Sequence, residues 1–215
     1  MAGSAARASA AVSDDGVVRY PVAEEFCTLQ GEGFHTGMAA VFIRLGGCDN
    51  GCPWCDTAAA QTTRDCCWLT AGEIAAAAAE TGVSRAVVTG GEPSMWNLEA
   101  LTEALHDAGM RVFLETSGTH PLSGELDWIC LSPKSFAPPL EGAFAEADEL
   151  KVVIAEEKEF GYAEECAAKV SGECRLSLQP EWNTRASAIP MIVEYIKKHP
   201  RWRLSLQMHK LINIP

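Results

Sequence analysis

The sequence contains no long apolar run and few basic residues. None of its apolar stretches approaches the roughly 20 residues that a membrane-spanning helix needs. The first residues, MAGSAARASAAV, contain no apolar segment of the kind found at the centre of a signal peptide. Lys and Arg number 17 against 29 Asp and Glu, so the net charge is −12. Such a surface repels phosphate backbones and anionic lipids. We therefore expect a cytoplasmic protein, with no nucleic acid and no membrane as partner.

The length and the apolar content indicate one folded domain. The 215 residues are enough for a single core and short for two, and 47% of them are apolar. We expect residues 1–16 to be a flexible N-terminal extension and residues 17–215 to form the domain.

Short apolar segments alternate with helical patterns from residue 38 onward. Apolar residues three and four apart predict helices, and Thr70 and Glu73 have the spacing of a capping box at the start of one of them. The predicted helices are 70–81, 97–108, 158–170 and 187–198. The predicted strands are 40–45, 85–89, 111–115, 127–131, 150–154, 175–179 and 202–207. Apolar strands that alternate with helices indicate a parallel sheet. About six such units are too few for an eight-fold barrel, so the predicted fold is α/β, a partial (β/α)6-like TIM barrel.

Polar and turn-forming residues follow most of the predicted strands. They include 90–93 (GGEP), 115–118 (ETSG), 132–134 (SPK), 179–181 (QPE) and 207–210 (QMHK). In any single loop, Gly, Pro and Ser are explained as turn residues. Because ligands bind at the carboxyl ends of the strands in barrels and open α/β sheets, the repeated pattern predicts one composite site along this edge.

Nine cysteines are many for this length, and three of them stand close together. Cys48, Cys52 and Cys55 have C-x3-C-x2-C spacing in a Gly-rich segment directly after a predicted strand. A [4Fe–4S] cluster usually takes four cysteine ligands. With three, one iron keeps an open position that can bind and reduce a small molecule. A zinc site that takes a further ligand from Cys66 or Cys67 is an alternative, as are buried core thiols.

Together with GGEP and ETSG after the next two strands, this triad resembles the radical S-adenosylmethionine superfamily. The resemblance implies that Cys48, Cys52 and Cys55 hold a [4Fe–4S] cluster. It also implies that the open iron binds the amino and carboxylate groups of S-adenosylmethionine, and that residues 17–215 are a radical S-adenosylmethionine domain.

Further segments resemble the 7-carboxy-7-deazaguanine synthase family, over nearly all of the chain from about residue 20. They are 26–33 (FCTLQGEG), Arg44, 55–57 (CDT), 131–134 (LSPK), 178–180 (LQP) and 207–210 (QMHK). The resemblance implies conversion of 6-carboxy-5,6,7,8-tetrahydropterin to 7-carboxy-7-deazaguanine with loss of ammonia, a step of queuosine and deazapurine biosynthesis. It also implies Mg²⁺ on the substrate carboxylate, a flavodoxin- or ferredoxin-type reductant and a homodimer.

The resemblance assigns a role to each matching residue. Thr57 would bind Mg²⁺ through its hydroxyl, a hard oxygen donor, and the planar fork of Arg44 suits the carboxylate of the pterin. Glu32 would either bind the amine edge of the pterin or brace its loop. The other expected substrate-binding residues are Leu29, Gln30, Gly31, Thr89, His209 and, through the terminal carboxylate, Pro215. The expected S-adenosylmethionine contacts are Trp54, Asp56, Gly91, Glu92, Ser117, Ser132, Pro133, Lys134, Gln179, Pro180, Glu181 and Trp182.

The sequence differs from the family pattern at one place, and two alternative functions are considered. Residues 58–60 (AAA) stand where relatives often carry bulkier polar or aromatic side chains. A glycyl-radical activating enzyme would share the triad and the size, but it would act on a protein partner. A non-catalytic iron–sulfur or zinc module that carries electrons would have no need of polar residues at six strand ends.

Overall fold

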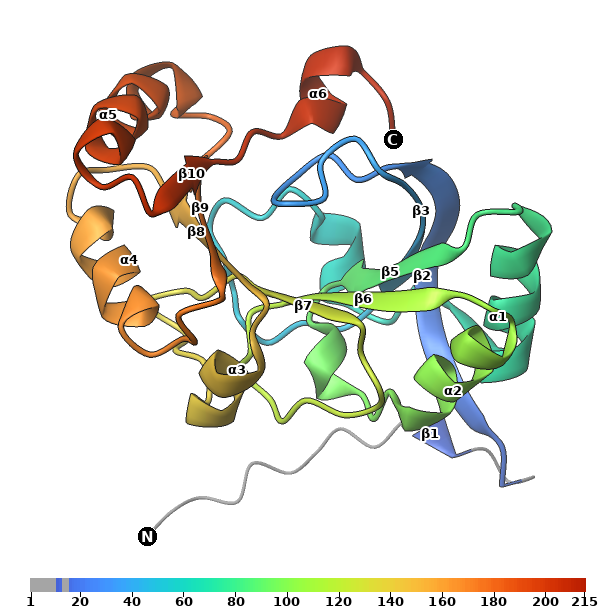
Figure 1. Ribbon diagram of the computed structural model, residues 1–215. Coiled ribbons are helices and arrows are strands. Elements are labelled where there is room, and N and C mark those ends of the chain that lie inside the picture. Colours follow the sequence, from blue (N-terminus) through green and yellow to red (C-terminus); the bar gives the residue numbers. More distant parts are fainter. Residues whose placement is uncertain (1–10, 13–15) are drawn as a thin grey trace, which may run out of the picture.

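A curved sheet of parallel strands forms the centre of the computed structural model, which describes residues 11–12 and 16–215 (Figure 1). The sheet has ten strands in these residues. The parallel strands follow one another in chain order and are β3 (Ala39–Leu45), β5 (Arg85–Gly90), β6 (Arg111–Thr116), β7 (Trp128–Leu131), β8 (Glu149–Ile154), β9 (Arg175–Pro180) and β10 (Trp202–Leu204). The path begins at β1 and ends at β10 without closing, which confirms the predicted partial barrel.

Antiparallel strands extend the sheet beyond β3. The long strand β2 (Val18–Leu29) pairs with β3, and β1 (Ala11–Val12) and β4 (Cys67–Thr70) pair with β2. The sequence patterns did not predict β2 or β4. Most of the predicted N-terminal extension, residues 1–16, lies outside the described residues, so that prediction stays open. Its residues 11–12 are part of the sheet.

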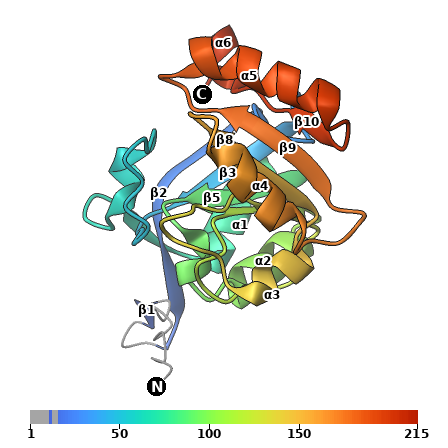
Figure 2. The same cartoon turned by 90° about the vertical axis from the view of Figure 1, so that its left-hand side faces the viewer.

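Helices connect the parallel strands and lie on the outer face of the sheet (Figure 2). They are α1 (Ala71–Glu80), α2 (Glu99–Asp107), α3 (Glu141–Glu146), α4 (Glu159–Ala167) and α5 (Arg185–Lys198). The chain also forms the short 3-10 helices η1 (Ala58–Gln61) and η2 (Pro93–Met95) and, after the last strand, helix α6 (Met208–Ile212). Thr70 caps α1 in the predicted capping box with Glu73. None of the helices in the described part of the chain combines the length and the apolar character needed to cross a membrane.

The last part of the chain differs from the prediction. The strand predicted at 202–207 ends at Leu204, and the strand-like apolar tail 211–215 begins inside helix α6. This helix and the C-terminus lie across the open side of the barrel, beside the β2–β3 connection (Figure 1). The backbone N–H of Met208 donates to the carbonyl of Gly31, so the tail spans the gap that the open sheet leaves.

Side chains of the parallel strands alternate between the helices and the barrel interior. In β6, Val112 and Leu114 pack in the core beneath α1 and α2, whereas Phe113 and Glu115 point to the interior. The same alternation places polar side chains inside, near the carboxyl ends of other strands: Arg44, Thr89, Lys151 and Gln179. The interior is therefore polar at the edge where the predicted site lies.

The β2–β3 connection, residues 30–38, fills the other end of the interior. Phe34 stacks on Trp128 with ring centroids 5.4 Å apart, and its backbone N–H donates to the buried carboxylate of Glu149 at the start of β8. The N–H of Gly33 donates to the hydroxyl of Ser205. These contacts close the amino end of the barrel and leave a cavity at its carboxyl end.

Candidate active site

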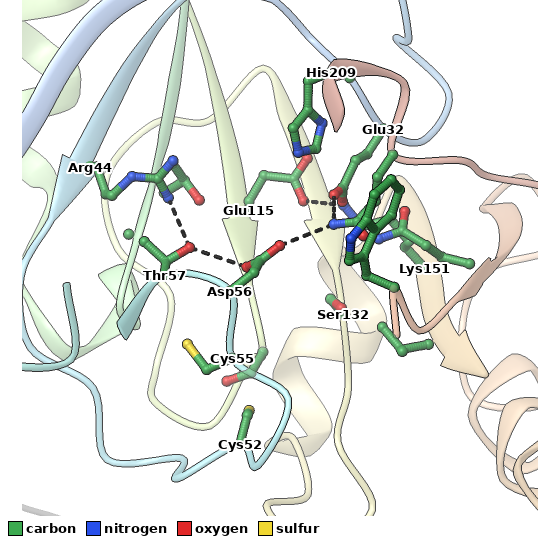
Figure 3. A pocket seen from close by; sticks show the side chains of 18 of the residues that line it. Glu32, Arg44, Cys52, Cys55, Asp56, Thr57, Glu115, Ser132, Lys151 and His209 are labelled. Carbon is green, nitrogen blue, oxygen red and sulfur yellow. Dashed lines mark hydrogen bonds and ion pairs between the residues drawn. The ribbon is translucent and has the colours of Figure 1, made fainter. Parts of the chain in front are cut away.

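A cavity of about 300 Å³ opens at the carboxyl ends of the parallel strands (Figure 3). Its volume lies at the lower end of the range of small-molecule sites. Every site residue predicted from the sequence lines it except Pro133. The structure thus brings together residues from seven separate segments of the chain, and Pro133 serves the turn after β7 without reaching the cavity.

The cysteine triad lies on the loop that follows β3. Cys48, Cys52 and Cys55 line the cavity, and none of them forms a disulfide. Burial raises the pKa of the Cys48 and Cys52 thiols, and for Cys52 the ammonium of Lys134 opposes this rise. Three free thiols on one loop at one cavity are a donor set that fits a [4Fe–4S] cluster with an open iron.

The other cysteines do not support the zinc alternative. Cys66 and Cys67 are absent from the cavity lining, and the thiol of Cys66 lies against Gly46 and contacts the carbonyl of Thr62. Within the described residues, no group of three or more His, Cys, Asp or Glu side chains is arranged to hold a single metal ion. Cys130 and Cys174 are buried in the fold, as their apolar neighbours indicate.

The turn after β5 packs directly against the start of the cysteine loop. The N–H of Gly91 donates to the carbonyl of Leu45, and the N–H of Glu92 donates to the carbonyl of Gly47. A Cβ on Gly91 would lie 2.2 Å from the Gly47 carbonyl oxygen. Only glycine allows this approach, which explains the second glycine of the GGEP segment.

The carboxylate of Glu92 links the cysteine loop to the ends of β5 and β6. Its side chain is almost completely buried. One oxygen accepts from the N–H and hydroxyl of Ser94 and from the hydroxyl of Thr116; the other accepts from the N–H and hydroxyl of Ser117. Asn50, between the first two cysteines, donates to Ser117 at 2.8 Å and to Glu92 at 3.5 Å. The acid therefore organises the loop around the triad.

Two further strand ends border the triad side of the cavity. After β7, the ammonium of Lys134 donates to the carbonyl and hydroxyl of Ser132. After β9, the carboxylate of Glu181 accepts from the N–H groups of Asn183 and Thr184 and so fixes the turn into α5. In that turn, the ring of Trp182 lies under two cations, Arg185 at 4.0 Å and Lys210 at 5.1 Å.

Arg44, Asp56 and Thr57 form a polar group on the β3 side of the cavity. The Nε of Arg44 donates to Glu24 at 2.8 Å, and one terminal nitrogen lies 3.5 Å from the Thr57 hydroxyl. That hydroxyl donates to Asp56 at 3.2 Å (Figure 3). Burial tends to raise the pKa of Asp56, but its bond and charge interaction with Lys210 outweigh burial and lower it. A hydroxyl beside a carboxylate fits the oxygen chemistry that Mg²⁺ prefers when water and substrate supply the other ligands.

The floor of the cavity holds a buried ion cluster. The Lys151 ammonium lies 2.8 Å from one oxygen of Glu32 and 2.8 Å from one oxygen of Glu115. Gln30 donates to the other oxygen of Glu115, and Gln207 donates to the other oxygen of Glu32. Each oxygen of Glu32 and of Glu115 therefore has a protein partner, and Lys151 joins the two carboxylates.

The C-terminal segment covers one side of the cavity. Lys210 pairs with Asp56 at 2.5 Å and Gln207 donates to the same carboxylate, so α6 is tied to the residue that follows the triad. The ring of His209 lies over Gly31, where a Cβ would collide with it at 2.2 Å. Burial lowers the pKa of His209, which favours the neutral ring. The carbonyl oxygen of Pro215 accepts from Thr28 at the edge of the cavity.

Sequence reasoning missed several residues that line the cavity. Lys151 carried a usable signal, because a lysine between Leu150 and Val152 interrupts an otherwise apolar strand. Glu115 was noted only as a strand end. The remaining missed residues are Phe26, Thr28, Phe42, Asn50, Gln61, Gly90, Thr116, Val153, Gln207 and Lys210.

The sequence of the barrel matches a known superfamily. A family model described as the Radical SAM superfamily matches residues 42–151, from within β3 into β8. A partial barrel of this sequence, with the three-cysteine loop after β3, is a radical S-adenosylmethionine domain. Its cofactors are a [4Fe–4S] cluster and S-adenosylmethionine.

Relatives extend the match over nearly the whole chain. A 7-carboxy-7-deazaguanine synthase of Flavobacterium psychrophilum is 46% identical over 201 residues, covering 91% of this chain and 92% of that protein. The enzyme of the same name from Synechocystis sp. is 46% identical over 197 residues, covering 92% and 94%. The crystal structure of QueE from Escherichia coli has a TM-score of 0.78 at 31% identity and covers 89% of this chain and 95% of that one. The chain belongs to the 7-carboxy-7-deazaguanine synthase family.

Proposed function

We propose that this protein converts 6-carboxy-5,6,7,8-tetrahydropterin to 7-carboxy-7-deazaguanine with loss of ammonia, as a step of queuosine or deazapurine biosynthesis. The observation that carries the proposal is the cavity itself. The three free thiols and the residues of the family-specific segments, which are far apart in the sequence, line one space of about 300 Å³. Relatives named 7-carboxy-7-deazaguanine synthase that match over about nine tenths of the chain favour the synthase over a glycyl-radical activating enzyme.

One side of the cavity binds the cofactors, and the opposite side binds the pterin. The triad side, with Glu92, Ser117, Ser132, Lys134 and the β9 turn, holds the cluster and S-adenosylmethionine. When bound, these cofactors supply the 5′-deoxyadenosyl radical that removes a hydrogen atom from the pterin. The opposite side, with Gln30, Arg44, Thr89 and His209, orients the pterin, and Gly31 allows the backbone to approach it closely.

Charge selects the orientation of the substrate within this cavity. The guanidinium of Arg44 keeps its terminal nitrogens directed at Thr57 and the cavity because Nε is held by Glu24. This fork binds the substrate carboxylate. The Thr57 hydroxyl would help to hold a Mg²⁺ ion, which would add positive charge beside that carboxylate. The terminal carboxylate of Pro215 is a further substrate contact. We infer a flavodoxin- or ferredoxin-type reductant and a homodimer from the family alone.

The test is an anaerobic assay of the protein reconstituted with iron and sulfide. S-adenosylmethionine, Mg²⁺, a strong reductant and the carboxytetrahydropterin are added, and products are followed by mass spectrometry. We expect 7-carboxy-7-deazaguanine from the wild type. We expect none from Cys48→Ala, Cys52→Ala or Cys55→Ala, whereas Cys174→Ala, which changes a thiol remote from the cavity, should retain activity.

The products of the assay show which part of the proposal is wrong if 7-carboxy-7-deazaguanine is not formed. Formation of 5′-deoxyadenosine without 7-carboxy-7-deazaguanine would retain the radical chemistry and reject the pterin as substrate. A triad variant that still binds a full cluster and turns over would contradict the assignment of the three ligands. Iron content and the visible absorption of each variant distinguish loss of the cluster from loss of turnover.

A further inference from the structure

Lys151 is a buried cation within strand β8, where it stands between the apolar residues Leu150 and Val152. Its side chain is 5% exposed, against 18% for Glu32 and 19% for Glu115. The neighbouring positions Leu150 and Val152 face the helices, so the lysine alone in this stretch points into the barrel (Figure 3). A buried ammonium is costly unless it is paired and hydrogen-bonded. Here two carboxylates from different elements satisfy it.

The two carboxylates respond differently to the shared lysine. Burial tends to raise the pKa of Glu32, but Lys151 and the hydrogen bonds from Gln207 and Gln179 outweigh burial and lower this pKa to about 2. Burial also raises the pKa of Glu115, and Lys151 only partly offsets the rise, because Glu32 adds to it. Glu32 therefore stays ionised at neutral pH, and Glu115 is the acid of the pair that gains a proton first as the pH falls.

The surroundings of Glu115 include several other titratable groups. Glu149 from β8 adds negative charge, and its presence also raises the pKa of Glu115. Cys130 from β7 faces Glu115, and burial raises the pKa of this thiol well above its ordinary value. His209 from α6 interacts electrostatically with both Glu32 and Lys151. Within this set Lys151 is the cation that favours the charged form of Glu115.

We propose that Lys151 is a positioning residue that holds Glu115 as a carboxylate directed at the substrate, with Glu32 as the fixed counter-ion that keeps Lys151 in place. This inference rests on the proposed function. Gln30, from the family-specific LQGEG segment, donates to Glu115 at 3.1 Å and completes the arrangement. The Glu32 carboxylate contributes through its ion pair with Lys151.

The physical reason is the repulsion between two neighbouring carboxylates. Without the cation between them, Glu32 and Glu115 cannot both stay ionised in a buried site, so the pair takes up a proton at a higher pH. Glu32 keeps its hydrogen bonds from Gln207 and Gln179, and the added proton goes to Glu115. Substrate binding that needs the Glu115 carboxylate is then lost at a higher pH.

The test is the pH dependence of substrate binding, separated from turnover. Holoenzyme with S-adenosylmethionine but without reductant is titrated with the carboxytetrahydropterin by calorimetry between pH 4.5 and 8.5. For Lys151→Met we expect the Kd for the pterin at pH 7 to be at least tenfold higher than in the wild type. We also expect the midpoint, the pH at which acid has halved the binding affinity, to lie at least one pH unit above that of the wild type. Lys151→Arg, which keeps the charge, should stay within about threefold of the wild-type Kd.

A compensating variant distinguishes the proposal from a general structural defect. In Lys151→Met/Glu32→Gln the second charge is also removed, so the midpoint should return to within half a pH unit of the wild type. Glu32→Gln alone should move the midpoint downward, because it removes a charge that raises the pKa of Glu115; this variant also carries the test if Lys151→Met does not fold. Lys158→Met removes an exposed lysine that pairs with Glu156 and is the matched control, with no expected change.

The outcomes either support the inference or overturn it. Wild-type midpoints in both Lys151→Met and Glu32→Gln would overturn it, as would a double variant that stays at the Lys151→Met midpoint. Such results, with a wild type that binds the pterin and forms 7-carboxy-7-deazaguanine, would leave the proposed function intact. A wild type that neither binds nor converts the pterin would instead reject the proposed function.

Discussion

Glu92 and Glu32 border the same cavity as buried carboxylates, but the protein holds them in different ways. Glu92 accepts hydrogen bonds from hydroxyl and backbone N–H groups at the ends of β5 and β6. Glu32 accepts from the ammonium of Lys151 and from amide side chains. Donors fixed by the backbone set a geometry, whereas an ion cluster sets a charge that responds to pH and to its neighbours. The cofactor side of the cavity therefore depends on shape, and the substrate side depends on charge.

This difference follows the chemistry that each side carries out. The triad loop must hold its thiols in one arrangement, and Glu92 supplies this through Asn50 and Ser117. The substrate side must recognise a polar ligand that binds and leaves. The charged groups on this side include the side chains of Lys151, Glu115 and Arg44. Substitutions on the two sides should therefore produce different kinds of defect.

Glu92→Ala should produce the largest effect, because it leaves the buried N–H groups of Ser94 and Ser117 without an acceptor. Each such loss costs about 1–3 kcal/mol, so we expect the free energy of unfolding to fall by roughly 2–6 kcal/mol. Turnover should fall at least tenfold as the triad loop loses its anchor. Urea unfolding and the reconstituted assay measure the two effects.

The control for this prediction is Glu103→Ala, which truncates an exposed glutamate in α2. It should change stability by less than about 0.5 kcal/mol. If Glu92→Ala were as stable as this control, Glu92 would not organise the loop, and the contrast between the two sides would be wrong.

The structure also explains which parts of this contrast were visible in the sequence. The apolar segments predicted the parallel strands from β3 to β9 nearly to the residue. Polar residues after the strands identified the site, because strand ends in a parallel sheet meet at one edge. The Glu92 side was predictable for this reason. The Lys151 cluster was not, because the sequence does not show which side chains from β6, β8 and the β2–β3 connection meet inside the barrel.

Two other elements were missed for identifiable reasons. Strand β2 contains Pro21 and the pair Glu24 and Glu25, which weaken its strand pattern; pairing with both β3 and β4 stabilises it all the same. The tail after Leu204 looks strand-like in composition, but contacts with Gly31 and Asp56 on the far side of the barrel opening hold it as a helix. Both outcomes are set by tertiary contacts, which local patterns do not contain.

Acid stability should distinguish the ion cluster from the neutral network. The folded-state pKa of Glu32, about 2, is below its ordinary value of 4.5, so its contribution is present above pH 4.5 and is lost as the pH falls toward 2. A difference of this size corresponds to about 3 kcal/mol as an upper limit. Glu32→Gln should therefore be less stable than the wild type at pH 7, by less than half that difference at pH 3, and nearly equal to it at about pH 2, as measured by urea unfolding.

Glu25→Gln on β2 is a control, because the pKa of Glu25 is raised in the folded protein whereas that of Glu32 is lowered. Burial raises the pKa of Glu25, so its charged form opposes folding at neutral pH and its removal should cost no stability there. A Glu32→Gln variant whose loss of stability stayed constant from pH 7 to pH 3 would show that the ion cluster contributes no pH-dependent stability.

Arg44 should give the smallest change in stability and a selective change in binding. Its side chain is 19% exposed and pairs with Glu24, which is 57% exposed, so solvent weakens the pair and its loss costs less than about 1 kcal/mol. Lysine at this position keeps the charge but loses the planar fork for a carboxylate. Loss of one charge-assisted hydrogen bond is worth about 1.5–3 kcal/mol, so Arg44→Lys should raise KM for the pterin at least tenfold, with kcat changed less than threefold.

The comparison of KM with kcat decides what Arg44 does. The matched control is Arg64→Lys, which changes an exposed arginine outside the cavity lining and should leave both constants unaltered. A decarboxylated pterin analogue should bind Arg44→Lys and the wild type equally well, because neither can use the fork. If Arg44→Lys kept the wild-type KM, or discriminated against the analogue as strongly as the wild type does, the substrate carboxylate would have to bind elsewhere. The charge that selects the pterin would then lie with Lys151 and Glu115 on the cavity floor.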